Sequence, residues 1–246
     1  DARRDHSMRI PRPDISITTG SPNACTQCHE DKTDSWAHDA LRDWGVTGRF
    51  TDLNLAKARM AADRGDMRAL PTLDSLVADE AVSPLMRASV IEQMSSLGSR
   101  QLPTAAAMLL RADNPVLRTS AVRSMRAMPP TQRYLMLRPF IDDVSLSVRM
   151  EVAQLLAGVP ESELRPKDIA ELNPLFAEYL AVQSDHLDMP SVQLQLANFW
   201  LDRGEAGKAE AALTEALLLN SQLEPALINL VDLLRRNGNN TKASQL

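Results

Sequence analysis

The sequence predicts an all-α protein, and three observations lead to that class. Apolar residues make up 44% of the chain and aromatic residues only 4%, and the 11 methionines suit packing between helices better than a β-sandwich. Apolar side chains recur at helical spacing within one segment after another. Similar segments also return at two fixed periods, 31 and 34 residues, which is typical of stacked helical repeats.

The 31-residue period lies in the middle of the chain and predicts pairs of helices. The three aligned segments are 83–97, 114–128 and 145–159. Each begins with a residue that suits the N-cap of a helix, namely Ser83, Asn114 or Ser145, and a proline follows the first two. A less regular helix precedes each segment, and two of these helices share a Leu-Pro-Thr start. Two helices per unit resemble short HEAT repeats, and we predict an α-solenoid of such units over residues 51–165.

Two sets of residues keep register within these aligned segments. The set that we predict to share one continuous core is Val90, Ala121 and Val152. The second set is Arg87, Arg118 and Arg149. These arginines either form a basic stripe for an acidic partner or bond to carboxylates and carbonyls of the adjoining repeat, and we favour the second, structural interpretation. The carboxylates available nearby are Asp79, Asp113 and Asp143.

The 34-residue period lies near the end of the sequence. Leu196 and Leu230 are one period apart, and so are Gly204 and Gly238. Small and large packing residues over 191–246 resemble tetratricopeptide repeats, with one complete repeat and a second that stops after its first helix. A serine stands where that repeat usually has its proline.

A transition joins the two repeat regions, with a helix expected from Asn173 through Gln183. We therefore predict a tetratricopeptide domain over residues 166–246, truncated at its end. Because the sequence starts without methionine and stops inside a repeat, we expect it to be a piece of a longer protein.

One motif carries chemistry, Cys25-Thr26-Gln27-Cys28-His29, and it uses both cysteines of the chain. Two thiols three residues apart can add to the two vinyl groups of one haem, and the adjacent imidazole can then bind the iron. Cys25 and Cys28 are therefore candidates for the thioether links of a covalent haem c, and His29 for the proximal iron ligand. A zinc site would need a second pair of ligands, and a redox dithiol would need a βαβ setting, and the sequence has neither.

The motif belongs to a first segment, residues 1–50, which we predict to be the end of a haem domain. Residues 1–32 are rich in proline, serine, threonine and charge, so we expect an irregular but ordered stretch. A short helix is expected from about Asp34 to Trp44. Its predicted apolar stripe is Trp36, Ala40, Leu41 and Trp44.

A second iron ligand is harder to assign from the sequence. His6 lies upstream in a stretch restrained by two prolines, and is a candidate distal ligand of this haem or of a neighbouring haem. Met8 is a weaker candidate. His38 and His186 are interpreted as surface residues.

Residues 6–36, with the elements DHSMRIPRPD and NACTQCH, resemble the last haem-binding stretch of bacterial multihaem cytochromes c whose C-terminal half carries HEAT-like and tetratricopeptide repeats. The resemblance follows the whole chain in domain order. It implies export to the periplasm, haems ligated by two histidines, and electron transfer among closely spaced haems and to a redox partner protein. This sequence has a single CxxCH motif, so the other haems would lie in a missing N-terminal region.

Other function classes find less support. A rival hypothesis is a protein–protein interaction scaffold whose haem site is unloaded or vestigial. A third, a multihaem oxidoreductase, needs a haem with an open coordination position, and no catalytic residue is visible here. The net charge of −5 argues against nucleic-acid binding, and no apolar run is long enough for a membrane span.

Overall fold

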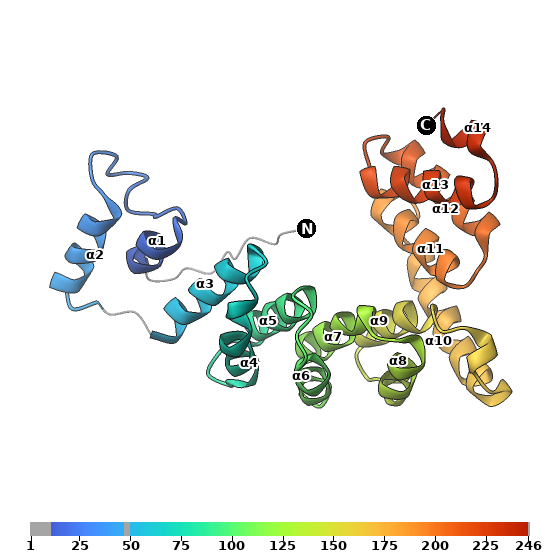
Figure 1. Cartoon of the computed structure of the whole chain (residues 1–246), viewed down its shortest axis with the longest axis horizontal. Helices are drawn as coiled ribbons and strands as arrows, with labels where there is room; N and C mark the ends of the chain where they lie inside the picture. Colours follow the sequence, from blue (N-terminus) through green and yellow to red (C-terminus); the bar gives the residue numbers. More distant parts are fainter. Residues whose placement is uncertain (1–10, 47–49, 246) are drawn as a thin grey trace. The chain divides into compact units, whose positions relative to one another are not determined.

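The computed structural model describes residues 11–46 and 50–245, and all regular structure in these ranges is helical (Figure 1). The all-α prediction is therefore confirmed. Within those ranges every helix is too short or too polar to cross a bilayer. The chain divides into two compact units, Asp1–Ala106 and Ala107–Leu246, and the boundary falls inside one helix. The three domain ranges expected from the sequence stay predictions.

The first unit begins with a helix that the sequence analysis missed. The helices of this unit are α1 (Pro13–Thr19), α2 (Asp34–Asp43), α3 (Phe50–Asp63), the 3₁₀ turn η1 (Met67–Ala69), α4 (Leu70–Ala78), α5 (Pro84–Ser96) and the start of α6 (Leu102–Leu109). Pro13 and Gly20, interpreted as part of an irregular stretch, mark the ends of α1. Proline fits the first helical position, and Gly20 adopts the left-handed φ of 73° that ends a helix.

The short helix expected at 34–44 is α2, and its predicted apolar stripe is covered only in part, since Ala40 and Leu41 are half-buried. The buried residue is Ala37, at 1% exposure, whereas Trp36 and Trp44 are 37% and 73% exposed. α2 lies against α1, which has only 7 residues. So short a neighbour encloses a single small side chain of α2 and leaves both tryptophans at the surface.

The second unit continues the helical array. Its elements are the end of α6, α7 (Pro115–Ser124), η2 (Met125–Ala127), α8 (Pro130–Leu137), η3 (Arg138–Phe140), α9 (Leu146–Leu156), η4 (Glu161–Glu163), α10 (Pro166–Ser184), α11 (Pro190–Asp202), α12 (Ala206–Leu219), α13 (Glu224–Arg236) and α14 (Asn240–Ala243).

The three helix starts predicted from the 31-residue period are confirmed at α5, α7 and α9. Asn114 caps α7, since its side chain accepts a hydrogen bond of 2.9 Å from the backbone N–H of Val116. α7 and α9 lie side by side (Figure 1), and Ala121 and Val152 on them are both 0% exposed. Val90 is also 0% exposed, inside the first unit, and a core continuous through all three helices stays a prediction.

The 34-residue period returns as a repeated turn. Gly204 and Gly238 follow α11 and α13, with left-handed φ values of 73° and 77°. Just after each glycine, a backbone N–H donates to a carbonyl five residues earlier, from Glu205 to Trp200 and from Asn239 to Leu234, both at 2.8 Å. α12 packs against both α11 and α13. Helices α11 and α13 therefore end in the same kind of turn.

The helix expected from Asn173 to Gln183 starts earlier, at Pro166. The Asp168 carboxylate accepts a hydrogen bond of 3.2 Å from the backbone N–H of Arg165, which closes the start of α10. Pro174 lies inside this helix. Proline removes one helical hydrogen bond and can be tolerated inside a helix, so Pro174 does not mark the start of α10.

Candidate functional site

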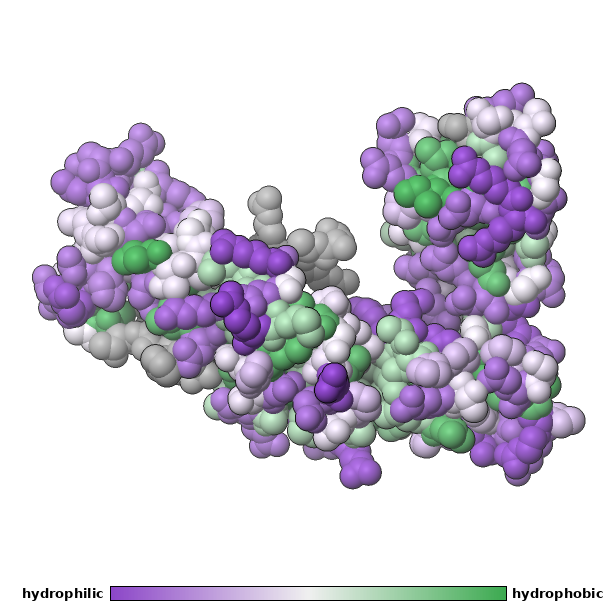
Figure 2. Space-filling model, in the orientation of Figure 1, coloured by the Kyte–Doolittle hydropathy of each residue, from purple (hydrophilic) through white to green (hydrophobic). Residues whose placement is uncertain are grey.

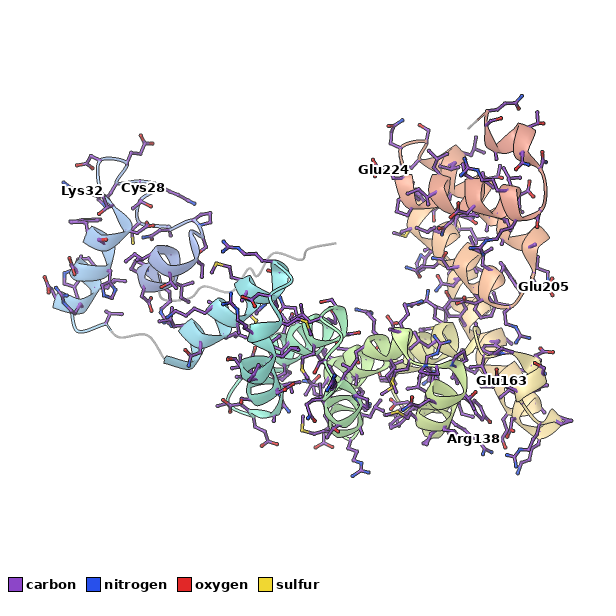
Figure 3. All side chains as sticks on the ribbon, viewed as in Figure 1. Cys28, Lys32, Arg138, Glu163, Glu205 and Glu224 are labelled. Atoms are coloured by element: carbon purple, nitrogen blue, oxygen red, sulfur yellow. The ribbon has the colours of Figure 1, made fainter. Side chains whose placement is uncertain are left out.

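The Cys25–His29 motif lies on the loop between α1 and α2, where Figure 3 labels Cys28 and Lys32. A tight turn brings the motif together. The backbone N–H groups of Cys28 and His29 both donate to the carbonyl of Cys25, at 3.3 and 3.0 Å. Cys25, Cys28 and His29 thus all belong to one turn, as the sequence predicted from their spacing.

The three candidate side chains are accessible. Cys28 and His29 are exposed, Cys25 is half-buried, and both cysteines are free thiols. The His29 imidazole lies against Trp36 of α2, with ring centroids 5.0 Å apart and an interplanar angle of 58°. Its ring nitrogens make no hydrogen bond to the part of the chain that the structure describes.

These residues fit a covalently attached haem. Thioether formation needs two free thiols that a vinyl group can reach, and iron ligation needs an imidazole nitrogen that is not already engaged. Cys25, Cys28 and His29 meet both conditions. Cys25 and Cys28 would hold the porphyrin, and His29 would bind its iron.

A polar network supports the turn, and its members were not predicted from the sequence. Asn23 is only 5% exposed, and its Oδ1 accepts a hydrogen bond of 3.0 Å from the backbone N–H of Cys25. Its Nδ2 donates to Asp34 at the start of α2, also at 3.0 Å. The signal that was available is an asparagine two residues before a turn, where its side chain often bonds to the backbone.

The remaining candidate ligands are not brought to this turn. His6 and Met8 lie outside the described residues. His38 is half-buried on α2, and His186 is exposed in the second unit. Among residues 11–46 and 50–245, no three His, Cys, Asp or Glu side chains are grouped to hold a metal ion. A haem on Cys25 and Cys28 would take one imidazole from this turn and needs no such group.

Large apolar side chains remain exposed on residues 11–46, and one of them, Trp36, lies against His29. These side chains are Ile17, Trp36 and Trp44. Figure 2 shows a hydrophobic spot amid hydrophilic surface where α1 and α2 lie. Trp36 is exposed and in contact with His29, so a haem on this turn would bury part of its apolar surface.

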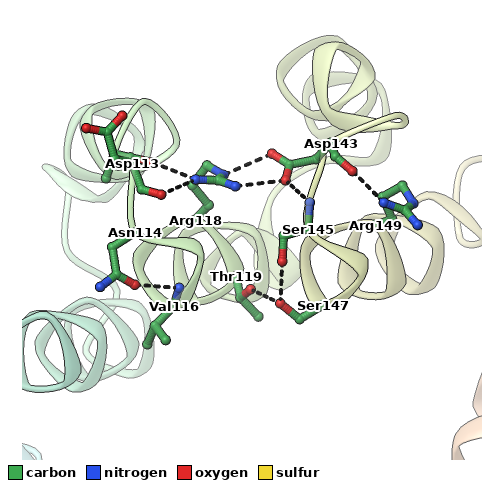
Figure 4. A network of polar contacts seen from close by, with 10 residues as sticks. Asp113, Asn114, Val116, Arg118, Thr119, Asp143, Ser145, Ser147 and Arg149 are labelled. Carbon is green, nitrogen blue, oxygen red and sulfur yellow. Dashed lines mark hydrogen bonds and ion pairs between the residues drawn. The ribbon is translucent and has the colours of Figure 1, made fainter.

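The arginines of the 31-residue period are the second group of candidate residues, and the hydrogen bonds that they make confirm the structural interpretation. Arg118 is 8% exposed and holds both carboxylate oxygens of Asp143 at 2.9 Å, while its Nη1 donates to the carbonyls of Ala112 and Asp113 at 2.8 Å (Figure 4). Arg149 donates to the carbonyl of Asp143.

Arg149 and Arg87, the other two arginines of the series, are also bonded within the helix array. Arg149 also pairs with Glu178 through two hydrogen bonds of 2.8 and 2.6 Å, and Arg87 donates to the carbonyl of Val77 at 2.9 Å. Because Arg118 and Arg149 are paired with carboxylates and all three arginines bond to backbone carbonyls, they stabilise the helix array rather than form a basic stripe.

Comparisons with known proteins do not add to this picture. A scan of protein-family models, a search of curated proteins and a search of solved structures each give no match for the chain.

Proposed function

We propose that residues 11–46 hold a covalent haem c and that the chain is part of an electron-transfer cytochrome. The observation that carries the proposal is the single turn on which two free thiols and an unengaged imidazole lie, at Cys25, Cys28 and His29. The exposed positions of Cys28 and His29 favour this use, because a large cofactor can reach them without unfolding the loop.

Haem supplies an iron that accepts and releases one electron at a time. The residues of this chain would control how that group is held. Cys25 and Cys28 fix the porphyrin covalently, and His29 binds the iron. Trp36, 5.0 Å from the His29 ring, limits the rotation of the imidazole and covers one side of it.

The rest of the chain is proposed to be a scaffold of two repeat types, HEAT-like over 51–165 and tetratricopeptide over 166–246. Support comes from Arg118 and Arg149, which donate to the carbonyls of Ala112 and Asp143, matching positions 31 residues apart. Further support comes from the turns at Gly204 and Gly238, which match one another 34 residues apart. Such scaffolds bind partner proteins over extended surfaces.

The wider setting is proposed from the sequence resemblance alone. It comprises export to the periplasm, further haems in a preceding region of the same protein, histidine as the second ligand with His6 as candidate, and a redox partner protein. A multihaem oxidoreductase as the parent protein would also agree with this setting.

The test is to export the chain to the periplasm of a bacterium that carries the cytochrome c maturation machinery, and to record the absorption of the reduced protein in alkaline pyridine. The matched controls are the Cys25→Ala/Cys28→Ala variant and the same chain made in the cytoplasm without that machinery. We expect the haem c spectrum in the exported chain only.

A folded, exported chain without covalent haem would contradict the proposal. That result would instead favour an interaction scaffold with an unloaded site, which the many fully buried apolar side chains of α7 to α13 would still support.

A further inference from the structure

The turn that carries the cysteines is tied to α2 before any haem is considered. Asn23 is the link, because each end of its side-chain amide has a partner. Oδ1 accepts from the backbone N–H of Cys25, and Nδ2 donates to Oδ1 of Asp34, both at 3.0 Å. Thr26, between the two cysteines, places its hydroxyl 3.3 Å from the same carboxylate oxygen and 3.2 Å from the Asn23 carbonyl.

Asp34 is well placed to anchor this network. It is the first residue of α2, and the preceding Thr33 caps the helix by accepting a hydrogen bond of 3.2 Å from the backbone N–H of Trp36. The position of the Asp34 carboxylate is therefore fixed by the first turn of a helix. Through Asn23, that fixed point holds Cys25 and, through the Cys25 carbonyl, the backbone of His29.

Burial points to a specific role for the pair. Asn23 is 5% exposed in a segment where most side chains are half-buried or exposed. A buried amide that lost either partner would be left with an unsatisfied donor or acceptor, which makes the arrangement sensitive to small chemical changes. Neither residue contacts a thiol sulfur or an imidazole nitrogen through any hydrogen bond of the described structure, so any effect on haem would be indirect.

We propose that Asn23 and Asp34 are positioning residues, which hold the Cys25–His29 turn in the form that accepts haem. This inference rests on the proposed function. Two thiols must meet two vinyl groups of one porphyrin, and a loop that already holds its turn loses less conformational freedom when they do. Without the pair, the same cysteines would sit on a looser loop and react less often.

The test exchanges the two side chains. Asn23→Asp places a carboxylate oxygen where Nδ2 now lies, 3.0 Å from Asp34 Oδ1, so two negative oxygens face one another. The double variant Asn23→Asp/Asp34→Asn restores one donor opposite one acceptor with the direction reversed. It also keeps an oxygen for the Cys25 N–H. The matched control is Asp39→Asn, on an exposed part of α2, where Asp39 pairs with Arg42 alone among the residues that the structure describes.

Two quantities are measured for each variant, one on the exported chain and one on the chain made in the cytoplasm without the maturation machinery. One is the fraction of chains that carry covalent haem, from intact mass. The other is the hydrogen-exchange protection of the Cys25 N–H in haem-free protein, which needs no loaded cytochrome. We expect Asn23→Asp to lower both by about tenfold. The double variant should recover to within about twofold of the unaltered chain, and the control should not change.

The outcomes separate this inference from the proposed function. Loading of Asn23→Asp equal to that of the unaltered chain would overturn the inference, and so would a double variant that fails to recover. If the unaltered chain carries no haem, the proposed function fails. Cys25 exchange then still decides whether Asn23 and Asp34 hold the turn. Far-UV circular dichroism of each variant is the control for whether its helices remain folded.

Discussion

Residues 11–46 and helices α7 to α13 are each stabilised internally, and by different kinds of interaction. In residues 11–46 the buried residues are few. They are Pro13, Ser16, Asn23 and Ala37, and two of them, Ser16 and Asn23, are polar. In the second, leucines, valines and aromatic residues are fully buried in succession, and Arg118 and Asp143 are paired among them. The segment with the chemical motif depends on hydrogen bonds, whereas the scaffold depends on packing.

This difference bears on the proposed haem. Ordering one residue costs about 1–2 kcal/mol, and burial of apolar surface returns about 25 cal/mol per Å². A segment that leaves Trp36 and Trp44 exposed gains little from burial by itself. We therefore expect attachment of a large apolar group to stabilise residues 11–46 and to leave the scaffold almost unaffected.

The largest expected effect falls on the scaffold, where Asp143→Ala removes the partner of Arg118. The side chains of Asp143 and Arg118 are 8% and 10% exposed. The substitution would therefore leave the Arg118 guanidinium without its carboxylate at a site with little access to water. Loss of one partner of a buried pair costs about 3–5 kcal/mol. Urea denaturation followed by circular dichroism should report that loss. Lys167→Ala, at an exposed pair, is the control and should change stability by less than about 0.5 kcal/mol. Equal effects of the two substitutions would contradict the buried role of Arg118.

A smaller effect, in the opposite direction, is expected for Tyr179→Phe. The Tyr179 hydroxyl is buried and makes no hydrogen bond of normal geometry among the described residues, although the side chains of Gln154 and Gln183 lie near it, and burial raises the pKa of Tyr179 to about 12. Removing an unsatisfied hydroxyl should stabilise the protein by about 1 kcal/mol at neutral pH.

The same variant has a pH signature. A raised folded pKa gives stability that is present below the unfolded value, about 10, and is lost as pH rises through the folded value. Tyr179→Phe should therefore lose less stability than the unaltered chain between about pH 10 and 12. Urea midpoints at neutral and alkaline pH measure both effects, and a variant less stable at neutral pH would refute them.

A weaker effect is expected for Glu178→Gln in acid. The hydrogen bonds from Arg149 hold the pKa of Glu178 below its ordinary value, against a smaller effect of burial. A lowered folded pKa gives stability that is present above the unfolded value, about 4.3, and is lost as pH falls through the folded value. The side chain is 37% exposed, so solvent screening limits the gain to less than about 1 kcal/mol. The stability difference from the glutamine variant should be present at pH 7 and vanish in acid, and a difference independent of pH would speak against the ion pair.

The smallest effect is expected for Cys25→Ala/Cys28→Ala on the scaffold. Cys25 takes part in the hydrogen bonds of its own turn, and the hydrogen bonds within α7 to α13 among the described residues do not involve either cysteine. Haem attachment should be abolished while the thermal transition of the helices shifts by an amount equivalent to less than about 0.5 kcal/mol. Loss of most helicity at room temperature would show that the two regions do not fold separately.

Helix starts were predictable from sequence because their chemistry is local. Asn114 caps α7 through its own side chain, and proline at the first position of α5 and α7 needs no neighbour to be favourable. That Arg118 bonds to carboxylate or carbonyl oxygens was predictable, because a buried guanidinium needs hydrogen-bond acceptors. Its particular partner, Asp143, depends on packing that the sequence does not display.

The failures have a common cause. In α1, Pro13 and Gly20 act as helix ends, and only the intervening residues and their tertiary neighbours decide whether a helix forms between two such signals. In α2, the small Ala37 faces α1 although the tryptophans carry more apolar surface. Asn23 went unnoticed because its role appears only when Cys25 and Asp34 are seen in space. Spacing alone did predict that Cys25, Cys28 and His29 share one turn.

The central claim is a covalent haem on Cys25 and Cys28, and peptide mapping of the exported chain tests it most directly. Protease digestion and mass spectrometry would locate the added mass. We predict one haem on the peptide that contains residues 25–29, and none on that peptide from the Cys25→Ala/Cys28→Ala variant. Unmodified thiols at both cysteines in a fully matured, folded preparation would contradict the claim.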